Sequence, residues 1–479
     1  MRTLILSAGL LLALSARAQT QDPGQEHQTH GGHEAPGEPS AHGEHEAPGE
    51  PSAHGEHEAH GQHEAHGEHR AGHMGHASGE SQEVRSLRDI PLMRRGSGTS
   101  WQPDLIPPSM LHWDVAGWGL MFQGLLFGGY DVQGGPRGDS AFTGVGWLML
   151  MVDRELPRGQ LVGSIMMSPE PFTAGANGGY PLLLQTGETY QDEPLRDRQH
   201  PHDLFMELAV SYSHYFSDTW GLLLYAAPAG EPALGPVAFP HRASAWYDPL
   251  AALGHHWQDA THISFGVLTA GLLTPTAKLE FSWFNGREPD ENRYNLDLRA
   301  PDSFSVRLSA NPTARVSAQV SYGFLRSPEL LEPEVSLHRL TASATYHAPF
   351  GSRGFWATTA VYGRNVEGEE APTDSFLLES SLDLDGHHVV FGRTEYVRKA
   401  GHDLVLPEAL EHTVFDVGNL VLGYVYNFGP FGPLRPGVGV RGSLNVVPEG
   451  LEPFYGSRTP VGGMVYVRLA PAGSHPMSR

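Results

Sequence analysis

The sequence contains no cysteine. Disulfides and thiolate metal sites are therefore excluded, and a bound metal ion must be held by imidazole, carboxylate or thioether groups. No cysteine follows the apolar run at the N-terminus either, which excludes a lipoprotein anchor.

Long apolar runs are missing beyond residues 1–18. A membrane-spanning helix needs roughly 18–20 predominantly apolar residues, and the densest later run, Trp147 to Val152, is far too short. The remaining possibilities are a soluble protein and a membrane β-barrel, in which only every second residue of a strand is apolar. Basic residues are also scarce, since the formal net charge is −23. Without a basic stripe to neutralise phosphates, we expect no nucleic-acid partner.

The N-terminus has the pattern of a cleaved signal peptide. Arg2 precedes the apolar run Leu4 to Leu14, and Ala16-Arg17-Ala18 offers the small residues that signal peptidase recognises. We expect residues 1–18 to be removed, so that the mature chain starts at Gln19 and is exported from the cytoplasm.

Residues 19–80 form a low-complexity tail rich in His, Glu, Gly and Pro. A twelve-residue unit, His-Glu-Ala-Pro-Gly-Glu-Pro-Ser-Ala-His-Gly-Glu, begins at His33 and again at His45. The tail has no residues that could form a core, and we expect it to be disordered. Residues 81–109 follow as a linker.

The tail also predicts metal binding. Imidazoles bind copper, zinc and nickel once they have lost their proton, and a flexible chain can gather them into many shifting sites. The alternative is an acidic spacer in which histidine is merely one polar residue among others. The candidate tail ligands are His27, His30, His33, His42, His45, His54, His57, His60, His63, His66, His69, His73 and His76.

Residues 110–471 alternate between apolar and polar side chains in short segments, and residues 472–479 form a polar C-terminal tail. In Val316 to Phe324, for example, every second residue from Val316 is Val, Ala, Tyr or Phe, and the residues between them are Ser, Gln and Gly. This period is typical of a transmembrane strand with one lipid-facing and one wet side. We count about sixteen such segments, which predicts an all-β, antiparallel transmembrane barrel.

The connections support this prediction because tight and long ones alternate along the chain. Both termini should then be periplasmic, with long loops outside. The clearest long connections, of which the first two should be protease-accessible on intact cells, are Thr173 to Pro201, Gly230 to Thr261, Asn285 to Pro301 and Lys399 to Thr413.

Charged residues recur on the polar side of the segments. A soluble β-sandwich would not need them there, and we expect Glu280, Arg307 and Arg441 to line a solvent-filled lumen. The other charges in this pattern are Glu207, Arg339, Glu379 and Arg393.

Two histidine clusters end the first two of the long loops. His200 and His202 lie on one side of an extended segment, and His255, Asp259 and His262 have the spacing i, i+4 and i+7. Only one strand separates the clusters, so with His241 they could form one metal site or a gate folded into the pore. The competing interpretation is that these side chains only hydrogen-bond the loops in place.

Two strings carry a resemblance to known proteins. Gly178-Gly179-Tyr180-Pro181-Leu182-Leu183-Leu184-Gln185-Thr186-Gly187-Glu188 and Gln199-His200-Pro201-His202-Asp203-Leu204 resemble a group of uncharacterised bacterial outer-membrane β-barrel proteins. The order of signal peptide, ligand-rich tail and barrel is similar to that of copper-resistance outer-membrane proteins. Those proteins use Met-rich repeats and shorter barrels, so copper specificity is not carried over.

The sequence therefore favours a porin-like channel in the outer membrane of a Gram-negative bacterium, with a periplasmic tail that binds copper, zinc or nickel. Its partners would be outer-membrane lipid and metal ions or small solutes. An alternative is a metal-sequestering protein whose barrel is mainly an anchor. A third class, an outer-membrane hydrolase using groups near His200 and Asp203, lacks a spacing that singles out a nucleophile with its base, and we expect no enzymatic activity.

Overall fold

The computed structural model describes residues 84–473 apart from 92, 93, 95–97, 99, 186 and 188. The signal peptide, the histidine-rich tail and the last six residues lie outside this range. No helix among the described residues is long and apolar enough to span a membrane.

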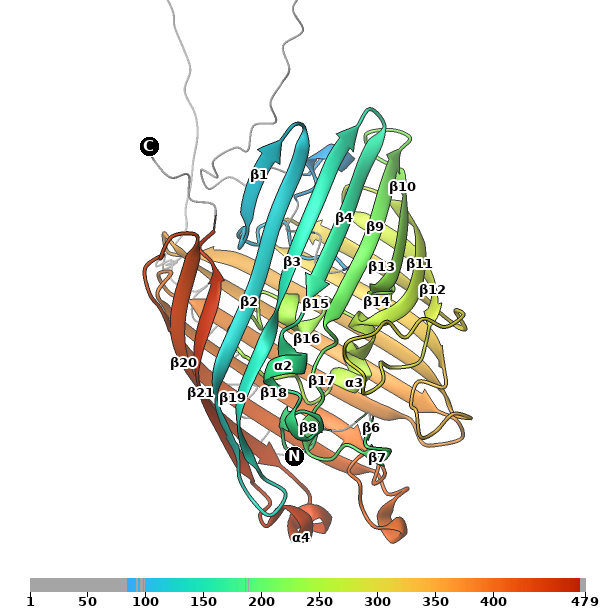
Figure 1. The fold of residues 1–479 in the computed structure, drawn as a ribbon, viewed down its shortest axis with the longest axis vertical. Coiled ribbons are helices and arrows are strands. Elements are labelled where there is room, and N and C mark those ends of the chain that lie inside the picture. Colours follow the sequence, from blue (N-terminus) through green and yellow to red (C-terminus); the bar gives the residue numbers. More distant parts are fainter. Residues whose placement is uncertain are drawn as a thin grey trace, which may run out of the picture. The chain divides into compact units, whose positions relative to one another are not determined.

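Sixteen antiparallel strands form a closed barrel (Figure 1). Each pairs with the next along the chain, and the last, β21, pairs with the first, β2. The predicted all-β transmembrane barrel of about sixteen strands is confirmed. The strands are β2 (Trp118–Gln133), β3 (Ser140–Leu156), β4 (Gly159–Met167), β9 (Phe205–Tyr215), β10 (Gly221–Gly230), β11 (Ser264–Leu273), β12 (Ala277–Asn285), β13 (Ser303–Thr313), β14 (Val316–Arg326), β15 (Ser336–Phe350), β16 (Gly354–Glu367), β17 (Thr373–Asp383), β18 (His388–Lys399), β19 (Phe415–Asn427), β20 (Leu434–Val446) and β21 (Val461–Pro471).

One further strand, β1 (Leu111–Val115), completes the seam of the barrel. It forms a hairpin with β2 and pairs from Leu111↔Phe122 to Val115↔Trp118. β21 covers the same edge of β2 only from Leu126 to Gln133. The two strands together thus pair most of this edge of β2, and closure of this kind is what a sheet in lipid requires.

Alternation along the strands sets the two surfaces of the barrel. In β12, Phe281 and Trp283 are each 49% exposed, whereas their neighbours Glu280 and Ser282 are at most 1% exposed. The same pattern holds in β13, where Ser303, Ser305, Arg307, Ser309 and Asn311 are buried. Apolar side chains therefore face outward to lipid and polar side chains face inward, as the period of two predicts.

The two ends of the barrel differ in the length of their connections. Tight turns such as residues 157–158, 274–276 and 351–353 lie at one end, which we call the short-turn end, and connections such as 168–204 and 231–263 lie at the other, the long-loop end. This alternation was predicted. Short elements occupy the connections and the segment before β1: α2 (Glu170–Thr173), α3 (His255–Gln258), α4 (Glu452–Tyr455), β5 (Tyr180–Pro181), β6 (Thr189–Tyr190), β7 (Glu193–Pro194), β8 (Arg198–Gln199), η1 (Leu87–Asp89), η3 (Ala176–Gly178), η4 (Phe239–His241), η5 (Ala260–His262), η6 (Glu408–Leu410) and η7 (Glu449–Leu451).

Candidate metal site inside the barrel

The connection between β10 and β11, residues 231–263, folds back into the barrel, and we call it the lumen loop. All of its residues except Pro240 and Ala260 are buried. Its sequence is dominated by Ala, Leu, Pro and aromatic residues, so folding into the lumen removes apolar surface from water. The wall supplies polar contacts for its backbone; the amide of Ala233, for example, donates to Ser282 Oγ at 2.7 Å.

Ion pairs fasten the lumen loop to the barrel wall. The guanidinium of Arg242 lies 2.6 Å from Glu379 on β17 and 2.8 Å from Asp259 in the loop itself. Asp248 lies 3.0 Å from Arg441 on β20. Breaking one partner of such a buried pair is costly, because the remaining charge is left without compensation. These pairs therefore hold the loop in one position.

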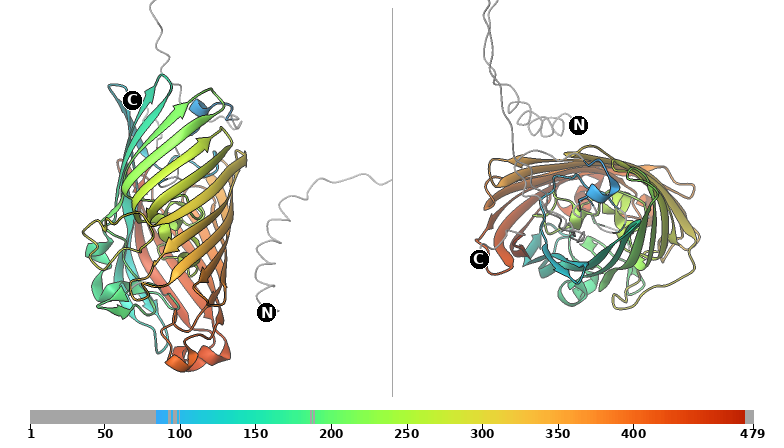
Figure 2. Two further views of the ribbon diagram at one scale, coloured as in Figure 1. Left: turned by 90° about the vertical axis from the view of Figure 1, so that its right-hand side faces the viewer. Right: turned by 90° about the horizontal axis from the view of Figure 1, so that it is seen from above.

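A second segment enters the lumen from the short-turn end (Figure 2). We call residues 84–110 the N-terminal segment. The amide of Gly98 donates to Glu207 at 2.9 Å. The Trp101 ring packs against the guanidinium of Arg94 at 4.7 Å and the ammonium of Lys278 at 4.9 Å. The lumen is thus narrowed from both ends.

Two expectations are corrected by this arrangement. Gly230 to Thr261 is buried in the barrel and is not a protease-accessible outer loop. Glu280, Arg307 and Arg441 point inward as predicted, but they are at most 3% exposed and do not line a solvent-filled lumen. The reason is that the lumen loop and the N-terminal segment cover them, a long-range packing that local alternation does not encode.

Five histidines from two connections meet where the lumen loop ends, and we call this group the histidine pocket. The His202 and His262 ring centroids are 5.1 Å apart, and those of His255 and His262 are 5.3 Å apart. His256 packs against His255 at 5.3 Å and His200 at 6.0 Å. The two clusters that the sequence places 53 or more residues apart thus line one pocket.

In three of these rings the Nδ1 atom is hydrogen-bonded to an oxygen atom. His255 Nδ1 lies 2.7 Å from Asp259 Oδ1, and His262 Nδ1 lies 2.7 Å from the Asp259 carbonyl oxygen. His202 Nδ1 lies 2.9 Å from Glu170 Oε1. Because a carbonyl oxygen only accepts, His262 Nδ1 must carry the proton in this bond, which leaves the Nε2 lone pair available.

The opposite ring nitrogens are the candidate metal ligands. The Nε2 atoms of His202, His256 and His262 are buried and have no hydrogen-bond partner among the described residues. A buried polar atom without a partner is costly. Imidazoles held at Nδ1 by a carboxylate or carbonyl oxygen, with Nε2 available, have the arrangement of metal-ligating histidines.

Electrostatics keep most of the pocket neutral. Burial lowers the pKa of His200 and of His262 well below its usual value, and neighbouring positive charges add to this effect. Burial also lowers the pKa of His255, although Asp259 opposes the shift. His202 is the exception: burial would lower its pKa, but the charge and hydrogen bond of Glu170 raise it. Neutral imidazole is the form that binds a metal ion.

The five histidines line a small cavity. The cavity has a volume of about 10 Å³, close to the room that one water molecule needs. Glu288 and Asp203 add carboxylates to its lining, and Arg293 lies 3.4 Å from Asp203. A site with several imidazoles and a carboxylate suits zinc, copper or nickel.

The structure places the predicted residues as follows. His200, His202, His255 and His262 share the histidine pocket, while His241 lies beyond His202 and packs against Trp147 at 4.1 Å. The helical spacing of His255, Asp259 and His262 is interrupted, since α3 ends before Asp259, which has φ −140°. The tail ligands His27 to His76 lie outside the described residues.

Sequence reasoning missed several groups at this site. His256 could have been included because it is next to His255. Glu170 and Glu288 carry no local signal, since their contacts with histidines are made across different loops. A separate group of three donors, Glu367, Glu370 and His402, was also missed.

No known protein family matches the sequence, and no curated protein matches it. Solved structures with a similar fold include OmpF of Salmonella typhi in complex with daunomycin, with 10% identity and a TM-score of 0.48 over 75% of this chain and 100% of that one. The anion-selective porin of Comamonas acidovorans has 12% identity and a TM-score of 0.45 over 74% and 99%. OprB of Pseudomonas putida has 9% identity and a TM-score of 0.44 over 74% and 94%. At these identities the likeness concerns the fold alone.

Proposed function

We propose that the chain is a porin-like channel of a Gram-negative outer membrane whose passage is controlled by a divalent transition metal. The histidine pocket would bind copper, zinc or nickel where the lumen loop meets the wall. The histidine-rich tail would collect the same ions on the periplasmic side. The observation that carries the proposal is that His202, His256 and His262 line one small cavity inside the barrel and that their Nε2 atoms are buried with no hydrogen-bond partner among the described residues.

The alternative, a metal-sequestering protein whose barrel is an anchor, is favoured by a different observation. The lumen loop and the N-terminal segment fill the barrel from both ends, so an immobile filling would leave no passage. A hydrolase has less support at this site, because no Ser, Thr or Tyr is among the described residues that line the pocket.

Single-channel recordings of the purified full-length chain separate the two candidates. We expect conductance in metal-free buffer and a change on adding Zn²⁺. The double variant His202→Ala/His262→Ala should conduct but lose the change. His388→Ala, which removes an exposed histidine bonded to Tyr424 on the outer face, is the matched control. A barrel that is folded, judged by heat-modifiable migration, yet never conducts would support the anchor instead.

A further inference from the structure

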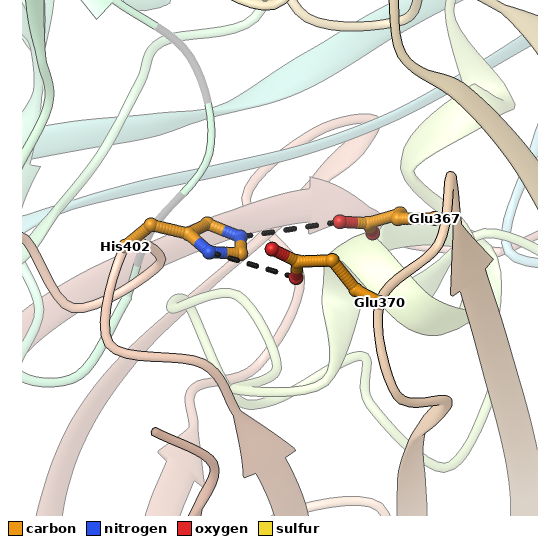
Figure 3. Close-up of side chains that lie close together, drawn as sticks. All are labelled: Glu367, Glu370 and His402. Atoms are coloured by element: carbon orange, nitrogen blue, oxygen red, sulfur yellow. Dashed lines mark ion pairs between the residues drawn. The ribbon is translucent and has the colours of Figure 1, made fainter. Parts of the chain in front are cut away.

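A second group of metal-type donors lies at the long-loop end, where the connections after β16 and β18 meet. It consists of Glu367, Glu370 and His402, and we call it the rim cluster. One donor atom from each residue lies within 4.8 Å of the other two. Figure 3 shows both carboxylates turned toward the ring of His402.

The carboxylate oxygens of the rim cluster lie near the ring nitrogens of His402 without being hydrogen-bonded to them. His402 Nε2 lies 4.0 Å from Glu367 Oε2, and His402 Nδ1 lies 3.8 Å from Glu370 Oε2. Both separations exceed a hydrogen bond. The two distances start from opposite nitrogens of the His402 ring, of which only one can bind a given ion. Ligands of a tetrahedral zinc ion with bonds of 2.0–2.1 Å are about 3.3 Å apart, so the three donor atoms, which lie within 4.8 Å of one another, would have to move closer to bind it.

Neighbouring contacts hold the carboxylates in this orientation. His412 Nδ1 lies 3.2 Å from Glu370 Oε1, the other oxygen of this carboxylate. Asp403 is fixed by the Ala400 amide, which donates to Oδ2 at 2.7 Å, while its Oδ1 lies 3.6 Å from His402 Nε2. These are the supports that orient ligands at metal sites.

Further acidic side chains lie near the rim cluster. Burial raises the pKa of Glu329 well above its usual value, and the nearby charges of Glu288, Glu367 and Asp403 raise it further. Glu288 in turn lies 3.4 Å from His256 Nδ1, at the histidine pocket. The amide of Glu288 also donates to the carbonyl oxygen of Pro328 at 3.0 Å, which places Glu288 beside the residue before Glu329. A cation near these carboxyl groups would favour their charged forms.

We propose that the rim cluster binds a divalent cation of the zinc type, and that Glu329 and Glu288 lead this ion to the histidine pocket. The first part stands on the rim geometry. The second rests on the proposed function, since it requires that the pocket accept the ion.

Crystals of the full-length chain soaked in ZnCl₂ would test both parts by anomalous scattering at the zinc edge. We expect one peak at the rim cluster and one in the histidine pocket. Glu370→Gln/His402→Ala should lose the rim peak alone, and His202→Ala/His262→Ala the pocket peak alone. No rim peak, or a rim peak that survives Glu370→Gln/His402→Ala, would overturn the rim site. A rim peak without a pocket peak would leave the rim site standing and overturn the pocket and the path to it.

The path also predicts a change in solution. For Zn²⁺ added on the long-loop side, the concentration giving half of the conductance change should rise by more than about tenfold in Glu370→Gln/His402→Ala, as expected for a damaged metal site. Arg364→Ala, which removes a partly exposed partner of Asp374, should leave this Zn²⁺ concentration unchanged. An unchanged value in the rim variant would contradict the path.

Discussion

At the scale of single residues, the histidine pocket depends on what holds each Nδ1 atom. An oxygen on Nδ1 fixes both the ring orientation and the tautomer. His262 is fixed by a carbonyl oxygen, which has no charge, whereas His202 is fixed by the carboxylate of Glu170. The two rings should therefore respond differently to pH.

The His202–Glu170 pair gives the first prediction. His202 has its folded pKa above 6.5, so its contribution to stability is full below that value and is lost as pH rises through the folded pKa. Burial alone would raise the pKa of Glu170, but the charge and hydrogen bonds of His202 lower it below 4.5. The contribution of Glu170 to folding stability is therefore present above pH 4.5 and is lost as pH falls through its folded pKa. The pair should be strongest between pH 4.5 and 6.5.

Glu170→Gln should loosen the segment around His202 mainly in that window, by about 1.5–3 kcal/mol, the worth of a hydrogen bond to a charged group. Hydrogen–deuterium exchange of residues 198–204 at pH 5.5 and pH 8.5 would measure this. Equal effects at both pH values would show that the charge of Glu170 is not what matters.

At the scale of elements, the ion pairs of the lumen loop give the second prediction. Glu379→Gln leaves the buried Arg242 without one of its carboxylates, which should cost about 3–5 kcal/mol. The loop should detach more readily and conductance should rise. The partly exposed pair Arg364–Asp374 is the control, and Arg364→Ala should cost less than about 1 kcal/mol. Denaturant unfolding and single-channel recording would measure both; similar costs for both variants would contradict this assignment.

The N-terminal segment gives the third prediction. Trp101 is buried between Arg94 and Lys278, and Trp101→Ala should cost about 3–5 kcal/mol of packing. The segment should then leave the lumen part of the time, seen as larger or more frequent openings. Trp220→Ala is the matched control, because Trp220 is exposed and stacks on Phe216 at 4.3 Å. Unaltered openings in Trp101→Ala would show that this segment does not obstruct the passage.

The elements also show what the sequence could and could not predict. The strands and the alternation of turns were predictable because a period of two and turn residues are local signals. The position of the lumen loop was not, since Arg242 finds its partner Glu379 137 residues away. The histidine clusters were predictable as candidates from residue type, but the oxygens that fix them, such as that of Glu170, come from another connection.

At the scale of the whole molecule, the fourth prediction concerns the tail. The barrel is formed by strands between Trp118 and Pro471, so deleting Glu26 to Glu80 should leave it folded and conducting. The metal bound per chain at neutral pH should fall, because thirteen histidines are removed. Mass spectrometry of metal content, with heat-modifiable migration as the folding control, would measure this. An unchanged metal content would exclude the tail as a collector, and loss of folding would assign it a role in assembly.

The central claim is that imidazole nitrogens inside the barrel hold a metal ion. X-ray absorption at the zinc edge tests it most directly, on the chain lacking residues 26–80 with Glu370→Gln/His402→Ala added, loaded with one equivalent of Zn²⁺. We predict at least two imidazole ligands with Zn–N distances of about 2.0–2.1 Å, lost in His202→Ala/His262→Ala. A spectrum with oxygen ligands only, or one unaffected by that double variant, would contradict the claim.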